Sequence, residues 1–405
     1  MKKIVLMSLV ASSVVLASGY KLPETSTNSV ALSGANIAHV NSADAAYDNP
    51  ANMIFMSDNN HMEADLMYVG TSATNYKDAA GTVDISADKQ TFVIPSFHYV
   101  SPKLGDSGAR VGVSVVVPGG LSRKWQDQPA KASAEEFTLE VIEVNPTAAF
   151  QVSDTVAIAV GFRIVHSSGV VKIDNPYVPG AALGNATQNM TGDSTDFGYN
   201  VALAYHPTKD IQVGVTYRSV VDLTTSGTAD LSYPASGLPT GTYDVSVSVP
   251  LPATFSVAAA YTFPTKTTVE FVYERTYWSR YKNIDFEYTN PAAEAIFGTQ
   301  KPKNWDDTSA YRLGVTQELD TVTLMAGVVL DATPTPETTL GFESPGSDSV
   351  SVSFGGRYAI NDSMDMGLGV LYSMKDDRTV KNATIDGEFT NSNALLISAG
   401  LGYKF

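Results

Sequence analysis

Four arginines stand in segments where apolar and polar residues alternate, and each lies on the polar side of that alternation. They are Arg163, Arg218, Arg312 and Arg357. Acidic residues at the same kind of position are Asp65, Glu270, Glu274 and Asp365. A guanidinium can hold a carboxylate through two parallel hydrogen bonds, and an inward charge needs such a partner. Either these arginines pair with the protein's own acids in a structural network, or one Arg or Lys holds the carboxylate of a ligand.

Catalytic and metal chemistry have little support in the sequence. The chain has no cysteine, no Gly-x-Ser-x-Gly elbow, no His-Glu-x-x-His and no phosphate-binding loop. His61 and His98 could be neighbours, but a metal needs at least one more ligand. We therefore predict no enzyme, no cofactor and no metal site, with a lumenal Ser–His hydrolase as a minor alternative.

Composition narrows the class of protein. The 405 residues carry 26 Lys and Arg against 42 Asp and Glu, a formal charge of −16. This disfavours a nucleic-acid partner, which would require a basic face. Charged residues make up only 17%, whereas about 25% is typical of soluble domains, and 20 residues are Tyr. The balance favours an all-β secreted or outer-membrane chain.

The N-terminus has the features of a secretory signal. Lys2 and Lys3 precede a mostly apolar run from Ile4 to Leu16, and small residues follow. The run is too short for a membrane-spanning helix. We predict a signal peptide over residues 1–17, with the mature chain starting at Ser18.

From His61 onward, apolar and polar residues alternate with a period of two. In the last segment Leu395, Ile397, Leu401 and Tyr403 share one face, while Ser398 and Lys404 share the other with glycines. Alternation of this kind predicts β-strands. A soluble sandwich would turn the apolar face inward, but polar faces rich in Gly, Ser and Arg and apolar faces ending in Tyr or Phe are typical of a membrane barrel.

Counting the segments gives fourteen strands with alternating short and long connections. This predicts an all-β, 14-stranded antiparallel transmembrane barrel over residues 59–405, with both termini periplasmic and the long loops outside. The expected strands are 61–76, 90–102, 109–118, 136–152, 154–173, 196–207, 210–225, 242–262, 265–280, 306–319, 321–331, 348–360, 363–375 and 391–405. The terminal Phe405 resembles the assembly signal of bacterial outer-membrane barrels.

Residues 18–58 do not alternate. Residues 29–40 predict one helix, and Asn49 can cap a second helix that Pro50 opens. The segment is either a disordered tail or a partly helical hatch that plugs the lumen. A fourteen-strand barrel has room for such a plug.

Short motifs in order along the chain carry a family resemblance. They are Gly19-Tyr20-Lys21-Leu22, Ala43-Asp44-Ala45, Asn49-Pro50-Ala51, Gly120-Leu121 through Trp125, Tyr217-Arg218-Ser219, Trp278-Ser279, Tyr311-Arg312-Leu313-Gly314, and Asp331 with Pro334 and Pro336. With them the chain resembles the FadL-type long-chain fatty acid transporters (OMPP1/FadL/TodX) of the Gram-negative outer membrane. Asn52 departs from the pattern, because many members carry Gly there.

The resemblance implies a route for hydrophobic substrate. An outer groove captures it, a lumenal pocket binds it, and hatch movement at Asn49, Pro50 and Ala51 releases it through a lateral opening beside a kinked third strand. Pro118, Gly119 and Gly120 are the candidates for that kink, although they could simply end the strand. The candidate ligand-binding cations are Arg312, Arg218, Arg163 and Lys172.

Apolar residues stand in segments expected to be outer loops. They are Pro176, Tyr177, Val178 and Leu183, and then Leu231, Tyr233 and Leu238. Exposed apolar groups mark contact with apolar partners, although loops can also pack on each other. By resemblance these two segments form the family's capture groove.

The predicted function is uptake of hydrophobic compounds, foremost long-chain fatty acids. Transport of aromatic hydrocarbons on the same scaffold and a general hydrophilic porin remain the alternatives. The expected partners are the apolar ligand, outer-membrane lipid and the barrel assembly machinery, and the protein is expected to be a monomer.

Overall fold

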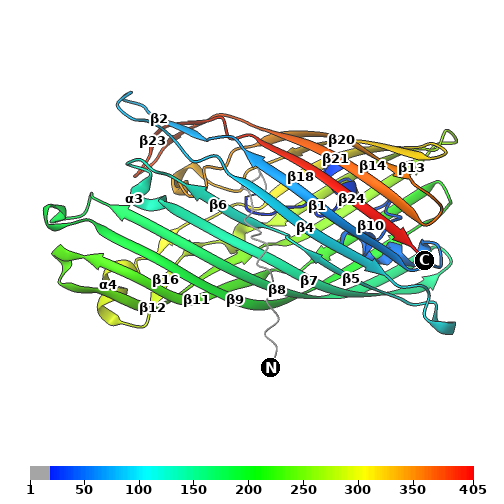
Figure 1. Cartoon of the computed structure of the whole chain (residues 1–405), viewed down its shortest axis with the longest axis horizontal. Helices are drawn as coiled ribbons and strands as arrows, with labels where there is room; N and C mark the ends of the chain where they lie inside the picture. Colours follow the sequence, from blue (N-terminus) through cyan, green and yellow to red (C-terminus); the bar gives the residue numbers. More distant parts are fainter. Residues whose placement is uncertain (1–18) are drawn as a thin grey trace.

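The wall of the molecule is a closed antiparallel barrel (Figure 1). The computed structural model describes residues 19–405, so the predicted signal peptide lies outside the described residues. Within that range fourteen wall strands follow in chain order, four of them divided into two segments, and β24 pairs with β1 to close the barrel. The predicted fold is therefore confirmed. The wall segments are β1 (His61–Thr71), β4 (Thr91–Val100), β5 (Arg110–Val116), β6 (Gly120–Lys124), β7 (Glu136–Ser153), β8 (Val156–Asn175), β9 (Ala186–Tyr205), β10 (Ile211–Arg218), β11 (Val221–Tyr233), β12 (Leu238–Leu251), β13 (Ala253–Thr262), β14 (Thr267–Tyr277), β16 (Phe286–Tyr288), β18 (Thr308–Glu318), β19 (Val322–Asp331), β20 (Ser349–Ala359), β21 (Met364–Lys375) and β24 (Ala394–Lys404).

Smaller elements cluster mainly at the end predicted to be outside, on the left of Figure 1. A four-stranded outer sheet covers a core that includes Tyr76, Trp125, Phe342 and Phe389. These smaller elements are β2 (Asn75–Asp78), β3 (Asp84–Ser86), β22 (Arg378–Lys381) and β23 (Asp386–Thr390) of the outer sheet, β15 (Asn283–Ile284), β17 (Lys301–Pro302), α3 (Lys131–Ala134), α4 (Pro291–Phe297), η2 (Gly105–Ser107), η3 (Ala181–Leu183), η4 (Pro234–Ser236), η5 (Trp278–Arg280) and η6 (Glu337–Thr339).

The two faces of the wall follow the alternation in the sequence. On β24 the side chains of Leu401 and Tyr403 are exposed, whereas Leu396 and Ser398 point inward and are buried. The same holds for β20, where Phe354 is exposed. Apolar groups therefore face outward to lipid along the membrane-spanning part of the wall.

The seventh wall strand (β10 and β11) and the eighth (β12 and β13) depart from this rule. The seventh is interrupted between Arg218 and Val221, and the eighth is interrupted at the same level, at Pro252. Arg218 pairs with Asn200 whereas Ser226 pairs with Asp193, so one extra residue is accommodated opposite β9. A one-residue shift turns an apolar set to the opposite face. The apolar residues of β10 therefore face out, and those of β11 face the lumen.

The predicted connections 174–195 and 226–241 are too long. Strands occupy most of both: β8 runs to Asn175, β9 starts at Ala186, and β11 and β12 continue to Tyr233 and Leu238. Their outward face is polar there, because these segments extend beyond the part of the wall that carries outward apolar residues. In the sequence, a strand whose outward residues are polar looks like a loop, and for this reason the predicted connections came out too long.

The third strand is broken at residues 117–119. β5 pairs with β4 only through Gly112–Val115, whereas β6 pairs with β7 and is joined to the segment before β4 only at its outer end, where Asp88 N–H donates to the Lys124 carbonyl at 2.9 Å. The N-terminal segment fills part of the gap, since Lys21 bridges to Gly119 and Leu22 N–H donates to the Pro118 carbonyl at 2.9 Å. The hydrogen-bonded wall is therefore open between β4 and β6.

Residues 19–58, called the hatch here, lie inside the barrel and are mostly buried. They form α1 (Thr27–Ala31), α2 (Ala45–Asp48) and η1 (Pro50–Phe55). Ser26 and Ser29 make a reciprocal cap for α1, and Asn49 caps η1 at Pro50 as predicted. The predicted helix 29–40 is wrong, because Ser33 and Gly34 adopt positive φ and end the helix.

Wall glycines make room for the hatch. A Cβ on Gly327 would lie 2.3 Å from the Leu32 carbonyl carbon, and one on Gly355 would lie 2.6 Å from the Ala31 Cβ. Similar contacts occur at Gly214, Gly314 and Gly369. The glycines on the inward faces therefore set how closely α1 and the following turn approach the wall.

Replacing Gly327 with Ala should displace the hatch but leave the barrel closed. The added methyl would overlap the backbone of Leu32, which cannot move without shifting α1. We expect ion conductance in planar bilayers to rise, with normal heat-modifiable migration on gels. Gly169→Ala is the control, because its nearest neighbour would be 3.7 Å away. Equal conductance in the two variants would contradict this role of Gly327.

Candidate functional site

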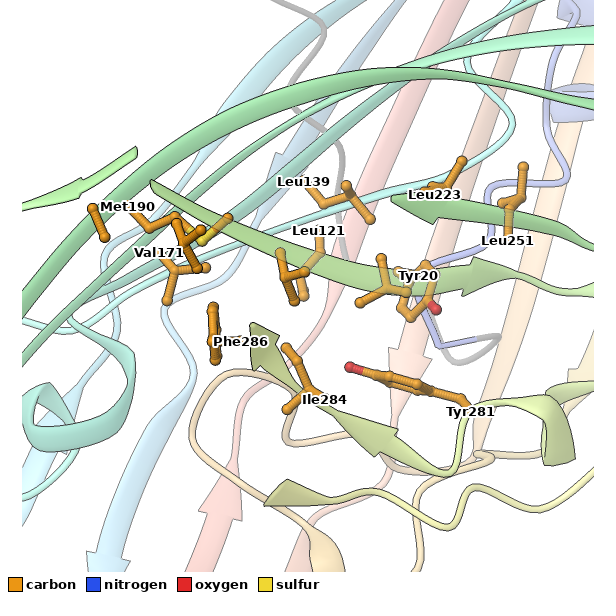
Figure 2. Close-up of a cluster of buried hydrophobic side chains, with 14 of the residues drawn as sticks. Tyr20, Leu121, Leu139, Val171, Met190, Leu223, Leu251, Tyr281, Ile284 and Phe286 are labelled. Atoms are coloured by element: carbon orange, nitrogen blue, oxygen red, sulfur yellow. The ribbon is translucent and has the colours of Figure 1, made fainter. Parts of the chain in front are cut away.

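An apolar cluster lines the outer half of the lumen, and we call it the lumenal apolar cluster. In Figure 2, Leu121 lies beside Leu139, its pairing partner on β7, and the Tyr281 ring lies next to Tyr20. The shift at Ser219 and Pro252 contributes the β11 and β12 side of this lining, because it turns the apolar residues of those two segments inward. Its buried members are Tyr20, Leu121, Leu139, Val141, Val165, Val171, Met190, Val221, Leu223, Ala229, Leu231, Leu238, Val245, Val247, Val249, Leu251, Trp278, Tyr281, Ile284, Phe286, Tyr288, Ala293 and Trp305.

Tyr20 of the hatch closes the inner end of this cluster. Its ring is 2% exposed and packs edge-on against Trp278, with the centroids 4.7 Å apart, and also contacts Trp305 and Tyr281. Its hydroxyl donates to the Pro250 carbonyl at 2.6 Å. Gly19 has φ +68°, and a Cβ there would lie 2.8 Å from both tryptophans. Only glycine lets the chain reach this position.

A cavity of about 80 Å³ lies beside the hatch, next to Tyr20's neighbours Lys21 and Leu22. Apolar side chains of Leu251 and Val272 line it together with Arg218 and Arg312. For comparison, an apolar cavity of about 150 Å³ binds benzene, and this cavity is about half that size. A ligand of that size or larger can therefore enter only if the hatch or a side chain moves.

Arg163 and Arg218 share one carboxylate. Arg163 donates to both oxygens of Glu143, at 3.1 and 2.9 Å, and Arg218 donates to the same Glu143. The Arg218 guanidinium also lies 3.9 Å from the centroid of the Tyr47 ring in the hatch. Glu143 therefore ties both arginines to one wall position, and Arg218 connects this group to Tyr47 of α2.

Arg312 joins the wall to the hatch. It donates to Glu274 at 3.1 Å and to the Ser33 carbonyl at 2.8 Å, and Lys21 also pairs with Glu274. Glu24 lies 3.9 Å from Arg312. Burial raises the pKa of Glu24 to about 7, and Arg312 limits the rise.

Arg357 makes a second wall–hatch connection. It donates to Glu63 at 2.7 Å, to Asp365 at 2.6 Å and to Asn28 of α1 at 2.8 Å. Every lumenal arginine that the sequence singles out is thus bound to a carboxylate of the protein. A ligand carboxylate would compete with that partner.

Glu270 has a role that sequence reasoning missed. One carboxylate accepts three consecutive hatch N–H groups, from Ile37 at 2.8 Å, Ala38 at 2.7 Å and His39 at 3.1 Å. Asn49 of the hatch motif donates from its side chain to the Ile37 carbonyl at 2.9 Å. The motif and Glu270 therefore hold the same turn. The only sequence signal was an acid at an inward position of β14.

The remaining predicted residues lie near the outer end. Lys172 pairs with Glu136 at 2.8 Å and is 38% exposed, apart from the arginines of the inner lumen. Tyr177 and Leu183 are exposed at 66% and 72% on the turn after β8. Tyr233 donates to the Pro179 carbonyl at 2.7 Å, so the two predicted capture segments contact each other. Leu231 and Leu238 are buried in the lumenal apolar cluster instead.

Pro118, Gly119 and Gly120 border the opening in the wall. Pro118 also lines the 80 Å³ cavity, and Leu121 directly after them belongs to the lumenal apolar cluster. Within residues 19–405 no three His, Asp or Glu side chains are arranged to hold a metal ion.

Comparison with known proteins places this geometry in a family. Residues 8–405 match the family described as outer membrane protein transport protein (OMPP1/FadL/TodX). The chain is 24% identical to the long-chain fatty acid transport protein of Escherichia coli over 96% of this chain and 95% of that one. It is 21% identical to outer membrane protein P1 of Haemophilus influenzae, covering 98% and 99%.

Solved structures share the fold. The structure of a Pseudomonas aeruginosa FadL homologue superposes with a TM-score of 0.83 at 20% identity, covering 95% of this chain and 99% of that one. The Pseudomonas putida toluene transporter TodX gives a TM-score of 0.74 at 17% identity, covering 94% and 98%.

Replacing Glu270 with Gln should loosen the turn at residues 37–39, because an amide cannot accept all three N–H bonds as an anion does. Since the chain has no cysteine, Ala38→Cys gives a single reporter. Loss of one charge-assisted bond predicts about tenfold or more faster maleimide labelling of that cysteine. Glu388→Gln, on the outer sheet, should leave labelling unchanged. If Glu270→Gln and Glu388→Gln were labelled at the same rate, Glu270 would not be the residue that holds this turn.

Proposed function

The chain belongs to the outer membrane protein transport family OMPP1/FadL/TodX, and from that premise we propose that it takes up hydrophobic compounds across the outer membrane, foremost long-chain fatty acids. The observation that carries the proposal is the lumenal apolar cluster, which leads from the outer turns to Tyr20 beside an opening in the wall. Transport proteins of this family lie in the outer membrane of Gram-negative cells, where the barrel with outward apolar faces fits.

Binding in the lumenal apolar cluster would be driven by burial. Each Å² of apolar ligand surface removed from water contributes about 25 cal/mol. The lining offers Leu, Val, Phe and Trp side chains on several strands, with few hydrogen-bonding groups to satisfy. It suits an alkyl chain or an arene better than a sugar.

Tyr20 would act as the gate between the cluster and the hatch. The cavity below it is too small for a ligand while the hatch is docked. Withdrawal of Tyr20 from Trp278 and Trp305 would join cluster and cavity. Asn49, Pro50 and Ala51 would control this movement, because Asn49 holds the turn that Glu270 also holds.

Release would occur sideways between β4 and β6. At the strand break of Pro118, Gly119 and Gly120, the backbone hydrogen bonds to the described chain are those with the hatch: Leu22 N–H donates to the Pro118 carbonyl, and Gly120 N–H donates to the Tyr20 carbonyl. Moving the hatch would therefore both enlarge the cavity and clear the opening.

The choice of cargo is between two apolar classes. The E. coli relative is named a long-chain fatty acid transport protein and the P. putida structure a toluene transporter. We favour fatty acids, with aromatic hydrocarbons as the alternative. A hydrophilic porin is disfavoured because the hatch fills the inner lumen. The test is uptake by a Gram-negative host without its own transporter: labelled oleate should accumulate, toluene alone would support the alternative, and sugar flux would support a porin.

Removing Pro118 should abolish uptake but not binding. Between Val116 and Gly120 this strand has one residue more than β7, so deleting one residue lets β5 and β6 run as one strand with both inward faces kept. We expect oleate uptake to fall to the level of cells without the protein, while the purified variant still binds oleate and shows wild-type ion conductance. Uptake at the wild-type rate would refute lateral release at this point.

A further inference from the structure

Arg123 on β6 differs from the other arginines that face the lumen. Arg163, Arg218, Arg312 and Arg357 are all bound to carboxylates. Arg123 is 7% exposed, yet no carboxylate within residues 19–405 pairs with it. Its Nη1 donates to the Thr74 hydroxyl at 2.8 Å, and its Nε has no hydrogen-bond partner. A buried guanidinium with an unsatisfied donor is costly unless an anion completes it.

A second cation lies on the same rim of the lumen. The Thr74 hydroxyl that accepts from Arg123 is 3.1 Å from the Ser392 hydroxyl, and the next residue, Asn393, accepts from the Lys375 N–H at 3.1 Å. Lys375 is close enough to Arg123 for their charges to interact, and Asp331 acts on Lys375 in the opposite sense. A second basic side chain therefore lies near Arg123.

Arg123 also stands between two apolar regions. Leu121, two residues earlier on the same face of β6, belongs to the lumenal apolar cluster. Trp125, two residues later, is fully buried in the core of the outer sheet. Successive residues on one face of a strand are about 6.6 Å apart. A headgroup on Arg123 would thus place an attached chain directly over Leu121 and into the cluster.

We propose that Arg123 binds the carboxylate of an anionic amphiphile whose alkyl chain occupies the lumenal apolar cluster. The Nε and Nη2 edge of a guanidinium suits a planar, two-oxygen anion. This inference rests on the proposed function and narrows its cargo, because a neutral hydrocarbon would leave Arg123 unpaired.

The test compares two ligands of equal chain length on the refolded full chain. Hexadecanoate should bind more tightly than hexadecan-1-ol to the wild type. Arg123→Gln should lower the affinity for hexadecanoate by about 10- to 150-fold, the range for one charged hydrogen bond, and leave the affinity for hexadecan-1-ol unchanged. Lys124→Gln is the matched control, since it removes a positive charge from the adjacent residue, whose side chain is 40% exposed and paired with Glu136.

The outcomes separate the two proposals. If the wild type binds neither ligand, the proposed function fails and this inference fails with it. If it binds both equally, or if Arg123→Gln weakens both alike, uptake of hydrophobic compounds stands and Arg123 has a structural role only. If Arg123→Gln does not fold, Arg123→Lys is used instead. It keeps the positive charge but has no Nε, so it should still lower the affinity for hexadecanoate and leave the affinity for hexadecan-1-ol unchanged. Equal binding of both ligands to Arg123→Lys and to the wild type would then overturn the inference.

Discussion

Compensation of charge inside the lumen is the constraint on which the architecture depends. A barrel satisfies its own backbone, but the inward faces of this one carry arginines and acids, most of which are buried once the hatch is in place. Arg312 and Arg357 each bind a wall carboxylate and a hatch group together, and Glu270 binds only hatch N–H groups. Complete removal of the hatch would strip several buried ions of partners at once. Partial withdrawal of its first residues, around Tyr20, breaks far fewer of these contacts.

One shift of register divides the lumen into two chemical zones. Below Ser219 and Pro252 the alternation sends apolar residues to lipid and polar residues inward, where the hatch satisfies them. Above that level the same alternation, moved by one residue, sends apolar residues inward and leaves Asp222 and Thr224 exposed. The outer part is thus built like a soluble barrel around an apolar core. Tyr20 stands at the boundary, with its ring in the apolar zone and its neighbour Lys21 in the charged one.

Strand number, the direction of the lipid face and the cap at Asn49 follow from the sequence because period-two patterns and helix caps are local. Two other features of the structure do not follow from the sequence. The shift at Ser219 is invisible, since Val213, Tyr217, Leu223 and Leu231 keep one parity throughout while their faces reverse. The partner of each lumenal charge depends on which strands face each other across the hatch. The sequence therefore shows that Glu270 and Arg123 are charged but does not show what each of them binds. The predicted helix 29–40 failed at Ser33, where tertiary contact with Gly327 replaces helical propensity.

The division into zones also bears on the direction of release. A ligand leaving the apolar zone toward the periplasm would have to pass Glu274, Arg312, Arg218 and Glu143, all paired with one another or with neighbouring charges, and an alkyl chain could compensate none of them. The opening at Pro118 to Gly120 lies before that barrier, because Leu121 belongs to the apolar zone and Pro118 lines the cavity at its edge. Beyond the opening the chain meets hydrocarbon, so no apolar surface has to return to water. The physical chemistry of the lumen therefore favours a sideways exit, and it requires that the hatch move only at residues 20–22, where the Tyr20 carbonyl and the Leu22 N–H are bonded across the gap.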